Sequence, residues 1–304
     1  LETLSESKVK DLFGKEATMM YKGGQLAVKA HGNRKFRFEA TEVYAEKLKK
    51  DRVTADKIYF RELNYRSFLA SQVSLMRSDG WLKNVLRAEE LGQALLFCAS
   101  LRGLLESCGD AIDITGVILF TLAENHELIC DALTGNSDKF ILMEEFEDKL
   151  IHFTHARKLT KEEKKSYPES HQAKHIFSYI DNLVDAGVLT AKDCYSEMCD
   201  FTHPGQSSLL PWVSEKGDLL ETHANADRKI IRRILKEYKE MFTPLFRVIY
   251  NPALMTLNLL NYFPLKEVHS PYLLKQGWTN APGWDRATAK IRKSRYYKIH
   301  SYAE

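Results

Sequence analysis

Residues 193–212, D-C-Y-S-E-M-C-D-F-T-H-P-G-Q-S-S-L-L-P-W, bring a phenol, thiols, carboxylates and an imidazole together just before a proline and a glycine. Tyr195, Cys199 and His203 recur every four residues, so a helix places all three on one face. The proline-glycine pair ends such a helix, because proline lacks the amide hydrogen that the helix ladder needs. The stretch therefore predicts a helix with a candidate site at its last turn.

Helical spacing of apolar residues also marks much of the remaining chain. It predicts one helix over residues 54–78, which Asp79-Gly80 should stop, and a second over residues 81–108. The second is apolar enough to be the central helix of a bundle. A third amphipathic helix is predicted over residues 227–250. The predicted fold is therefore mainly α, a multi-helix bundle.

The two ends of the chain carry other patterns. Alternation around the turn-forming Gly32-Asn33 predicts a small N-terminal β-hairpin over residues 26–40. Beyond Asn251-Pro252 a short apolar helix and then scattered prolines and aromatic residues predict an irregular C-terminal tail. We expect three parts, namely an N-terminal extension (1–53), the helical bundle (54–250) and a C-terminal extension (251–304).

Composition excludes several classes of protein. The 304 residues are 44% hydrophobic and 28% charged, which is typical of a globular chain rather than a disordered one. The net charge of +3 is too small to indicate nucleic-acid binding without local clustering. Five cysteines without a C-x-x-C pair or a secretory segment favour reduced thiols in the cytoplasm. No apolar run reaches membrane-spanning length, so we expect no membrane association.

His203 is the first candidate catalytic residue, because imidazole exchanges protons near neutral pH. The other interpretation is structural: Tyr195 and Cys199 are buried, and His203 bonds a carbonyl at the helix end. A thiol nucleophile has no identifiable base in the sequence. A zinc site lacks a second ligand pair, and His152 with His155 lacks a partner element, so we predict neither a metal nor another cofactor.

Arg102 and Glu106 interrupt an otherwise apolar helix and, four residues apart, share one face. They form either a structural ion pair or part of a polar pocket. The chain lacks the glycine-rich phosphate loops, the G-x-S-x-G elbow and the H-E-x-x-H zinc motif.

The densest basic cluster lies on the polar face of the helix predicted over residues 227–250. It is either a solvated helix face or a nucleic-acid-binding surface. Its members are Arg228, Lys229, Arg232, Arg233 and Lys236.

Two motifs, L-R-G-L-L-E at residues 101–106 and Y-S-E-M-C-D-F-T-H-P at residues 195–204, together resemble the helical bundles of the HEPN superfamily. The resemblance covers roughly residues 56–250 and is loose. Active members carry an arginine separated from the histidine by four to six residues, whereas this chain has Ser196, Glu197 and Met198 at those positions. Arg102 is then expected to supply the arginine in space.

The resemblance implies a bacterial defence or toxin-type protein that cleaves RNA without a metal. It implies catalytic roles for His203, Arg102, Glu106 and Tyr195, with the basic helix holding RNA. The alternative is a catalytically inactive interaction module that binds a protein partner or a second copy of itself. In either case we expect a homo-oligomer.

Overall fold

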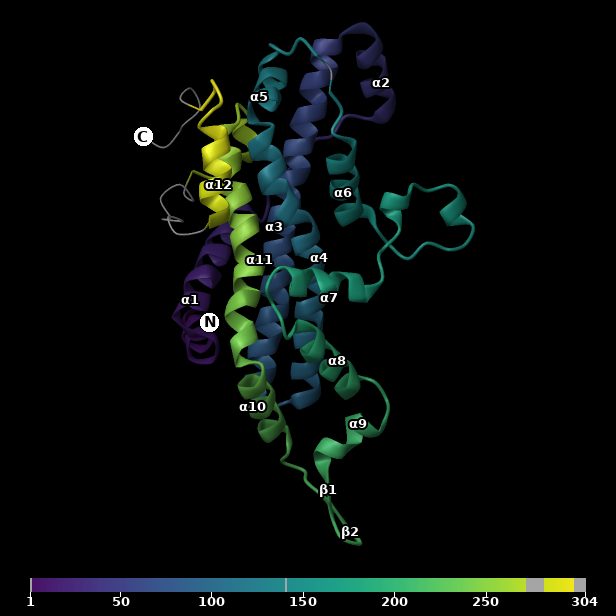
Figure 1. Ribbon diagram of the computed structural model, residues 1–304, viewed down its shortest axis with the longest axis vertical. Coiled ribbons are helices and arrows are strands. Elements are labelled where there is room, and N and C mark those ends of the chain that lie inside the picture. The colour runs from purple at the N-terminus through teal and green to yellow at the C-terminus, as the bar shows by residue number, and fades with distance from the viewer. Residues whose placement is uncertain (1, 140, 272–281, 298–304) are drawn as a thin grey trace. The chain divides into compact units, whose positions relative to one another are not determined.

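The computed structural model describes residues 2–139, 141–271 and 282–297, and Figure 1 labels its elements. Helices dominate and the sheet has two strands, which confirms the predicted mainly α fold. The α-helices are α1 (Glu2–His31), α2 (Thr41–Lys50), α3 (Arg52–Leu91), α4 (Ala94–Glu124), α5 (His126–Thr134), α6 (Glu144–His155), α7 (Ile176–Asp185), α8 (Ala191–Thr202), α9 (Gln206–Leu209), α10 (Asp227–Glu237), α11 (Lys239–Leu259) and α12 (Pro282–Ile291). The strands are β1 (Val213–Lys216) and β2 (Leu219–Thr222), and the 3-10 turns are η1 (Glu163–Lys165), η2 (Glu169–His171), η3 (Leu210–Trp212), η4 (Leu260–Tyr262) and η5 (Lys266–Val268).

The chain forms two compact units, each assembled from three separate stretches. Unit 1 comprises Leu1–Gln25, Ser74–Ile112 and His175–Tyr250, and unit 2 comprises Leu26–Val73, Asp113–Lys174 and Asn251–Glu304. The helices α1, α3, α4 and α11 each contribute a segment to both units. The division of the chain into residues 1–53, 54–250 and 251–304 stays a prediction.

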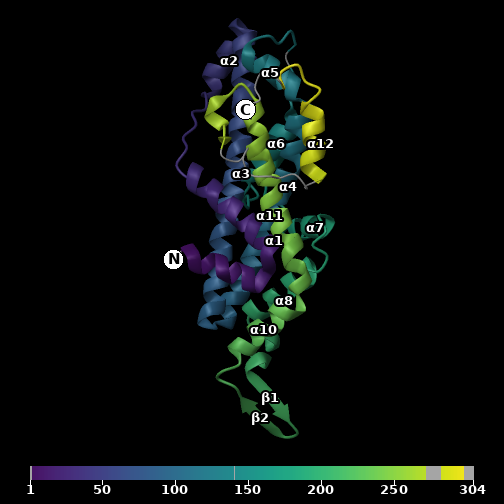
Figure 2. The same ribbon diagram turned by 90° about the vertical axis from the view of Figure 1, so that its left-hand side faces the viewer.

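Unit 1 has a core of leucine, isoleucine and phenylalanine side chains. Phe13 of α1 packs against Phe242 and Phe246 of α11, with ring centroids 4.7 and 5.2 Å apart. Gly14 follows with a φ of 88°, so α1 bends there, as Figure 2 shows. Other fully buried members of this core are Val85, Leu101, Leu105, Cys194, Ile234 and Leu245.

Unit 2 has its own aromatic and aliphatic core. His31 lies 5.1 Å from the ring of Phe68, and its Nε2 is 2.8 Å from the hydroxyl of Ser270. His126 of α5 similarly contacts Phe263, with ring centroids 4.8 Å apart. Further buried residues of this core are Phe60, Ile118, Leu122, Ile129 and Leu257.

The predicted N-terminal hairpin is wrong. Residues 26–31 belong to α1, where Ala27 is buried and Leu26 is exposed. Residues 34–40 form neither a helix nor a strand, and Phe36 packs against Tyr65 of α3 at 4.6 Å. Period-two alternation therefore reflects packing on a helix here. The hairpin that does form, β1 with β2, lies in unit 1.

Two predicted helix boundaries are also wrong. Asp79-Gly80 does not stop α3, because the buried Asp79 carboxylate accepts a hydrogen bond from Gln25 and pairs with Lys83 at 2.7 Å. The helix ends instead before Gly92, which has a φ of 66°. The helix predicted over residues 227–250 is two helices, because α10 ends at Glu237 and α11 runs from Lys239 past Pro252 to Leu259.

The predicted irregular C-terminal tail contains a helix, α12. Residues 272–281 and 298–304 of that tail lie outside the described part of the chain. None of the helices in the described residues has the length and apolar character of a transmembrane span.

Candidate active site at the end of α8

The site begins with an ion pair on α4. Arg102 Nε donates to Glu106 Oε1 at 3.1 Å, as their spacing of four residues allows. Both side chains are 30% exposed, whereas Leu101 and Leu105 beside them are buried. The pair therefore lies at the rim of the unit 1 core, where it keeps contact with solvent.

A close approach of α7 to α4 brings the next element to this pair. A Cβ atom at Gly109 would lie only 2.1 Å from the carbonyl oxygen of Tyr179, so only glycine allows the two helices to pack this closely. Gly109 comes almost one turn after Glu106 on α4. The α7–α8 hairpin is thereby positioned beside the ion pair.

Tyr195 of α8 contacts the ion pair from the buried side. Its hydroxyl donates to Glu106 Oε1 at 3.0 Å, and its ring meets Phe177 of α7 edge-on at 5.8 Å. Burial raises the pKa of Tyr195 above its usual value, and its hydrogen bonds with Cys199 and Glu106 act in the same direction. Tyr195 is therefore a phenol that donates to Glu106 and does not act as a base.

The end of α8 positions Thr202 and His203 beside Arg102. Thr202 is its last residue, and His203 follows with an extended backbone (φ −96°, ψ 144°), as is expected before proline. Arg102 Nη1 donates to Thr202 Oγ1 at 3.0 Å and lies 3.2 Å from His203 Nε2. A residue of α4 and a residue 101 positions later therefore meet.

Thr202 is a member of the site that the sequence pattern did not indicate. Its hydroxyl donates to Met198 O at 2.9 Å, which leaves the oxygen free to accept from Arg102. A threonine at the end of a helix is common and carries no catalytic signal of its own. We define the Arg102 cluster as Arg102, Glu106, Tyr195, Thr202 and His203.

The hydrogen-bond donors of Arg102 that have no partner among the described residues determine what the Arg102 cluster can still bind. A guanidinium has five N–H donors and no acceptor. Nε is used by Glu106 and Nη1 by Thr202 and His203, whereas no residue in the described part of the chain accepts from Nη2. A guanidinium can only donate, so His203 Nε2 is the acceptor in this contact. His203 itself is exposed.

A second cluster with the same residue types lies on another face of α8. Glu197 accepts from Arg233 of α10 and from the Tyr238 hydroxyl, the latter at 2.7 Å. Arg233 also donates to Glu237 at 2.8 Å. We define the Arg233 cluster as Glu197, Arg233, Glu237 and Tyr238. It ties α10 to α8.

The five basic residues predicted to bind nucleic acid fall into two groups, those with partners in the structure and those that form no ion pair within the described residues. Arg233 is paired with two carboxylates, and Arg228 packs against Gly92 and donates to Glu90 O at 3.5 Å. Lys229, Arg232 and Lys236 are exposed and form no ion pair within the described residues.

Four of the five cysteine thiols are buried. The five cysteines are unpaired, and burial raises the pKa of Cys98 to about 12 and raises those of Cys108, Cys130 and Cys194 further, which disfavours thiolates. Across residues 2–139, 141–271 and 282–297, no three His, Cys, Asp or Glu side chains gather as metal ligands.

Comparison with known proteins finds no matching family model, curated protein or solved structure. The chemistry assigned to the Arg102 cluster therefore depends on its own geometry.

Proposed function

We propose that this chain is a ribonuclease that cleaves RNA at the Arg102 cluster without a metal. The observation that carries the proposal is the 3.2 Å contact between Arg102 Nη1 and His203 Nε2, with Arg102 Nη2 facing no acceptor in the described residues. A phosphodiester presents two anionic oxygens, which a guanidinium binds well. The resemblance to HEPN bundles points to the same chemistry.

In the proposed reaction the RNA 2′-oxygen attacks the adjacent phosphorus. The new P–O2′ bond forms, the P–O5′ bond breaks, and the products are a 2′,3′-cyclic phosphate and a 5′-hydroxyl. A proton must leave the 2′-hydroxyl and a proton must reach the departing 5′-oxygen. His203 is the group of the Arg102 cluster suited to these transfers, because its ring is exposed, lies next to the phosphate site and can take up and release a proton.

Arg102 stabilises the extra negative charge on phosphorus in the transition state. Glu106 and Thr202 hold the guanidinium from two sides, and Tyr195 holds Glu106. This prior ordering matters because an arginine side chain otherwise loses rotamer freedom when it binds. Tyr195 and Glu106 are positioning residues in this proposal.

The test is cleavage of a fluorescein-labelled single-stranded RNA in the presence of EDTA. We expect the wild type to cleave it and His203→Ala to lose at least about 100-fold in kcat/KM. Arg102→Lys should lose a similar factor, because lysine lacks the planar fork that binds two oxygens. His155→Ala, which removes an exposed histidine of unit 2, is the matched control and should retain full activity.

Melting temperature separates catalysis from structure. We expect His203→Ala to melt with the wild type, because the exposed imidazole contributes little to the core. Activity that survives in His203→Ala would contradict the proposal, as would activity that EDTA removes.

The second candidate is an inactive interaction module, and exposed apolar residues near the hairpin favour it. Leu209 and Leu210 are 66% and 53% exposed, and Leu219 and Leu220 of β2 are 61% and 69% exposed. Leucines exposed to this extent suit a protein partner or a second copy of the chain. For such a module, neither the wild type nor His203→Ala would cleave the RNA.

A further inference from the structure

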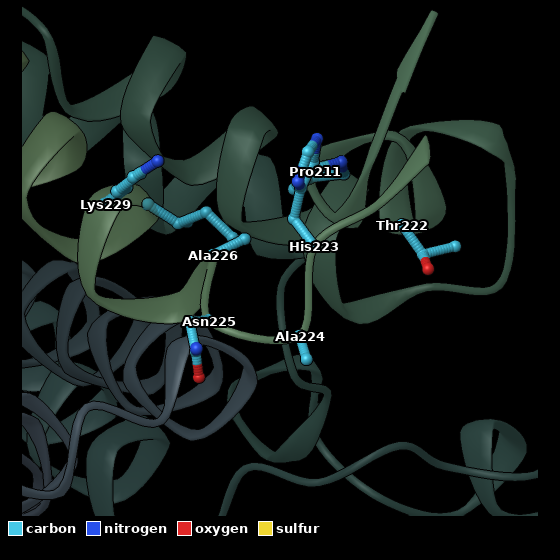
Figure 3. A pocket seen from close by; sticks show the side chains of 8 residues that line it. Pro211, Thr222, His223, Ala224, Asn225, Ala226 and Lys229 are labelled. Carbon is cyan, nitrogen blue, oxygen red and sulfur yellow. The ribbon is translucent and has the colours of Figure 1, made fainter. Parts of the chain in front are cut away.

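A pocket of about 420 Å³ opens between the end of β2 and the start of α10 in unit 1 (Figure 3). Its size lies in the range of small-ligand sites. His223 and Pro211 stand on one side of it and Lys229 on the other. Ile230, which is buried, contributes to an apolar wall. The pocket thus combines a flat ring, an apolar surface and one cation.

The His223 ring is fixed in place. Its Nε2 lies 2.7 Å from Ser214 Oγ of β1, and its backbone amide donates to Trp212 O at 2.8 Å. Trp212 is held in turn by Asp227 of α10 at 3.0 Å, and Asp227 also accepts from the Ala94 amide at the start of α4. A ring held in this way loses little entropy when another ring stacks on it.

Lys229 begins a row of cations that leads away from the pocket. Arg232 and Lys236 follow it at spacings of three and four residues on α10, so the three share one face. All three are exposed and form no ion pair within the described residues. Such a row can follow the phosphates of one nucleic-acid strand.

The order of contacts between α8 and α10 locates the pocket relative to the candidate active site. Tyr238 contacts Glu197, and Arg233 lies 5.9 Å from the Phe201 ring, so lower residue numbers in α10 match higher ones in α8. Lys229, one turn before Arg233, therefore lies toward the His203 end of α8.

We propose that this pocket binds one unpaired nucleotide of the single-stranded RNA cleaved at the Arg102 cluster, an inference that rests on the proposed function. The base stacks on His223 and Pro211, and its phosphate pairs with Lys229. A duplex is a poor fit, because the faces of paired bases are covered by their neighbours. Lys229 and the cations that follow it favour a ligand with phosphates, whereas a peptide is expected on the exposed leucines at 209, 210, 219 and 220.

The test measures RNA binding apart from cleavage. Every variant is made in a His203→Ala background, and fluorescence anisotropy follows a short labelled single-stranded RNA at several salt concentrations. Lys229→Ala should weaken binding about tenfold and reduce the slope of log K against log salt by about one. Lys10→Ala, which removes an exposed cation of α1 in unit 1, is the matched control and should change the affinity less than about twofold.

Two substitutions of His223 separate stacking from structure. His223→Phe keeps a flat ring but loses the contact with Ser214, and it should retain binding within about threefold. His223→Gln can keep a hydrogen bond to Ser214 but has no ring, and it should weaken binding about tenfold with an unchanged salt slope. The opposite order would show that His223 only holds the loop, and the proposal would be withdrawn.

The remaining outcomes also decide the matter. Equal affinity for duplex RNA, or no RNA binding at low salt, overturns the pocket proposal. Should the chain instead self-associate in a way that Lys229→Ala and His223→Gln abolish, the occupant is a segment of a second copy. If RNA binding depends on the pocket but the chain that retains His203 does not cleave RNA, the ribonuclease proposal is rejected and the pocket proposal stands. If the chain cleaves RNA and the pocket variants have an unchanged KM, the pocket proposal is rejected and the ribonuclease proposal stands.

Discussion

The Arg102 cluster and the Arg233 cluster share three residue types, arginine, glutamate and tyrosine, and both join α8 to a neighbouring helix. In each, a glutamate accepts from an arginine and from a buried tyrosine hydroxyl. They differ in how many carboxylates pair with the arginine, two at Arg233 and one at Arg102. Arg233 donates to two carboxylates, whereas Arg102 Nη2 meets no acceptor in the described residues and Nη1 contacts an exposed imidazole.

This difference shows that an arginine, a glutamate and a tyrosine do not by themselves make a site. Two carboxylates compensate the charge of Arg233, which links α10 to α8. Arg102 has one carboxylate, one hydroxyl and one imidazole, so it keeps positive charge to offer to an anion. Positive charge offset by only one carboxylate, beside a proton-transfer group, is the feature that distinguishes the candidate site.

The largest expected contrast comes from replacing the two glutamates by glutamine. Glu106→Gln should lower kcat/KM for RNA cleavage about 100-fold, because Arg102 loses its charged anchor and the phosphate site shifts. Glu197→Gln should leave cleavage nearly intact and lower the free energy of unfolding by about 1–3 kcal/mol, because Arg233 and Tyr238 lose a shared acceptor. Cleavage assays and denaturant titration of both variants measure these effects.

Equal effects of the two glutamine variants on activity and stability would show that the Arg102 cluster and the Arg233 cluster do not differ in function. Glu237→Gln is a further control. It weakens the Arg233 cluster at an exposed ion pair, and such pairs contribute at most about 1 kcal/mol.

A smaller effect is expected at Thr202. Thr202→Val preserves shape but removes the acceptor for Arg102 Nη1, so kcat/KM should fall about tenfold. Thr202→Ser keeps the hydroxyl and should remain within about threefold of the wild type. Both are measured with the same RNA substrate, and a serine variant as impaired as the valine variant would refute a role for the hydroxyl.

The smallest expected effect is on stability at alkaline pH, and it should be similar in both clusters. Burial, followed by hydrogen bonds to their partners, raises the pKa of Tyr195 and of Tyr238 above the usual value of about 10. The unfolded chain therefore loses these protons first as pH rises. The stabilisation is complete below about pH 10 and declines above it. Tyr195→Phe and Tyr238→Phe should each reduce the decline.

Urea titrations at a series of pH values around and above 10 measure that decline. A variant whose stability changes with pH in parallel with the wild type would show that its phenol is not the group responsible. The other buried tyrosines serve as an internal reference, because they are unchanged in both variants.

Local patterns in the sequence predicted much of the helical fold and the pieces of the candidate site. The spacing of Arg102 and Glu106 gave their pairing, and Pro204 gave the end of α8. The patterns failed where another element changed their meaning. The alternation around Phe36 arises from packing against Tyr65, and Asp79 remains in a helix because Gln25 and Lys83 satisfy its carboxylate.

By itself, the sequence determined which residues share a helix face and where proline and glycine interrupt a helix, because these depend on neighbours a few positions away. Only the tertiary structure decided that Arg102 lies beside His203 and that Arg233 forms ion pairs with two carboxylates. Those contacts require two helices to pack closely, as Gly109 permits at Tyr179, and residue spacing does not specify which helices will meet.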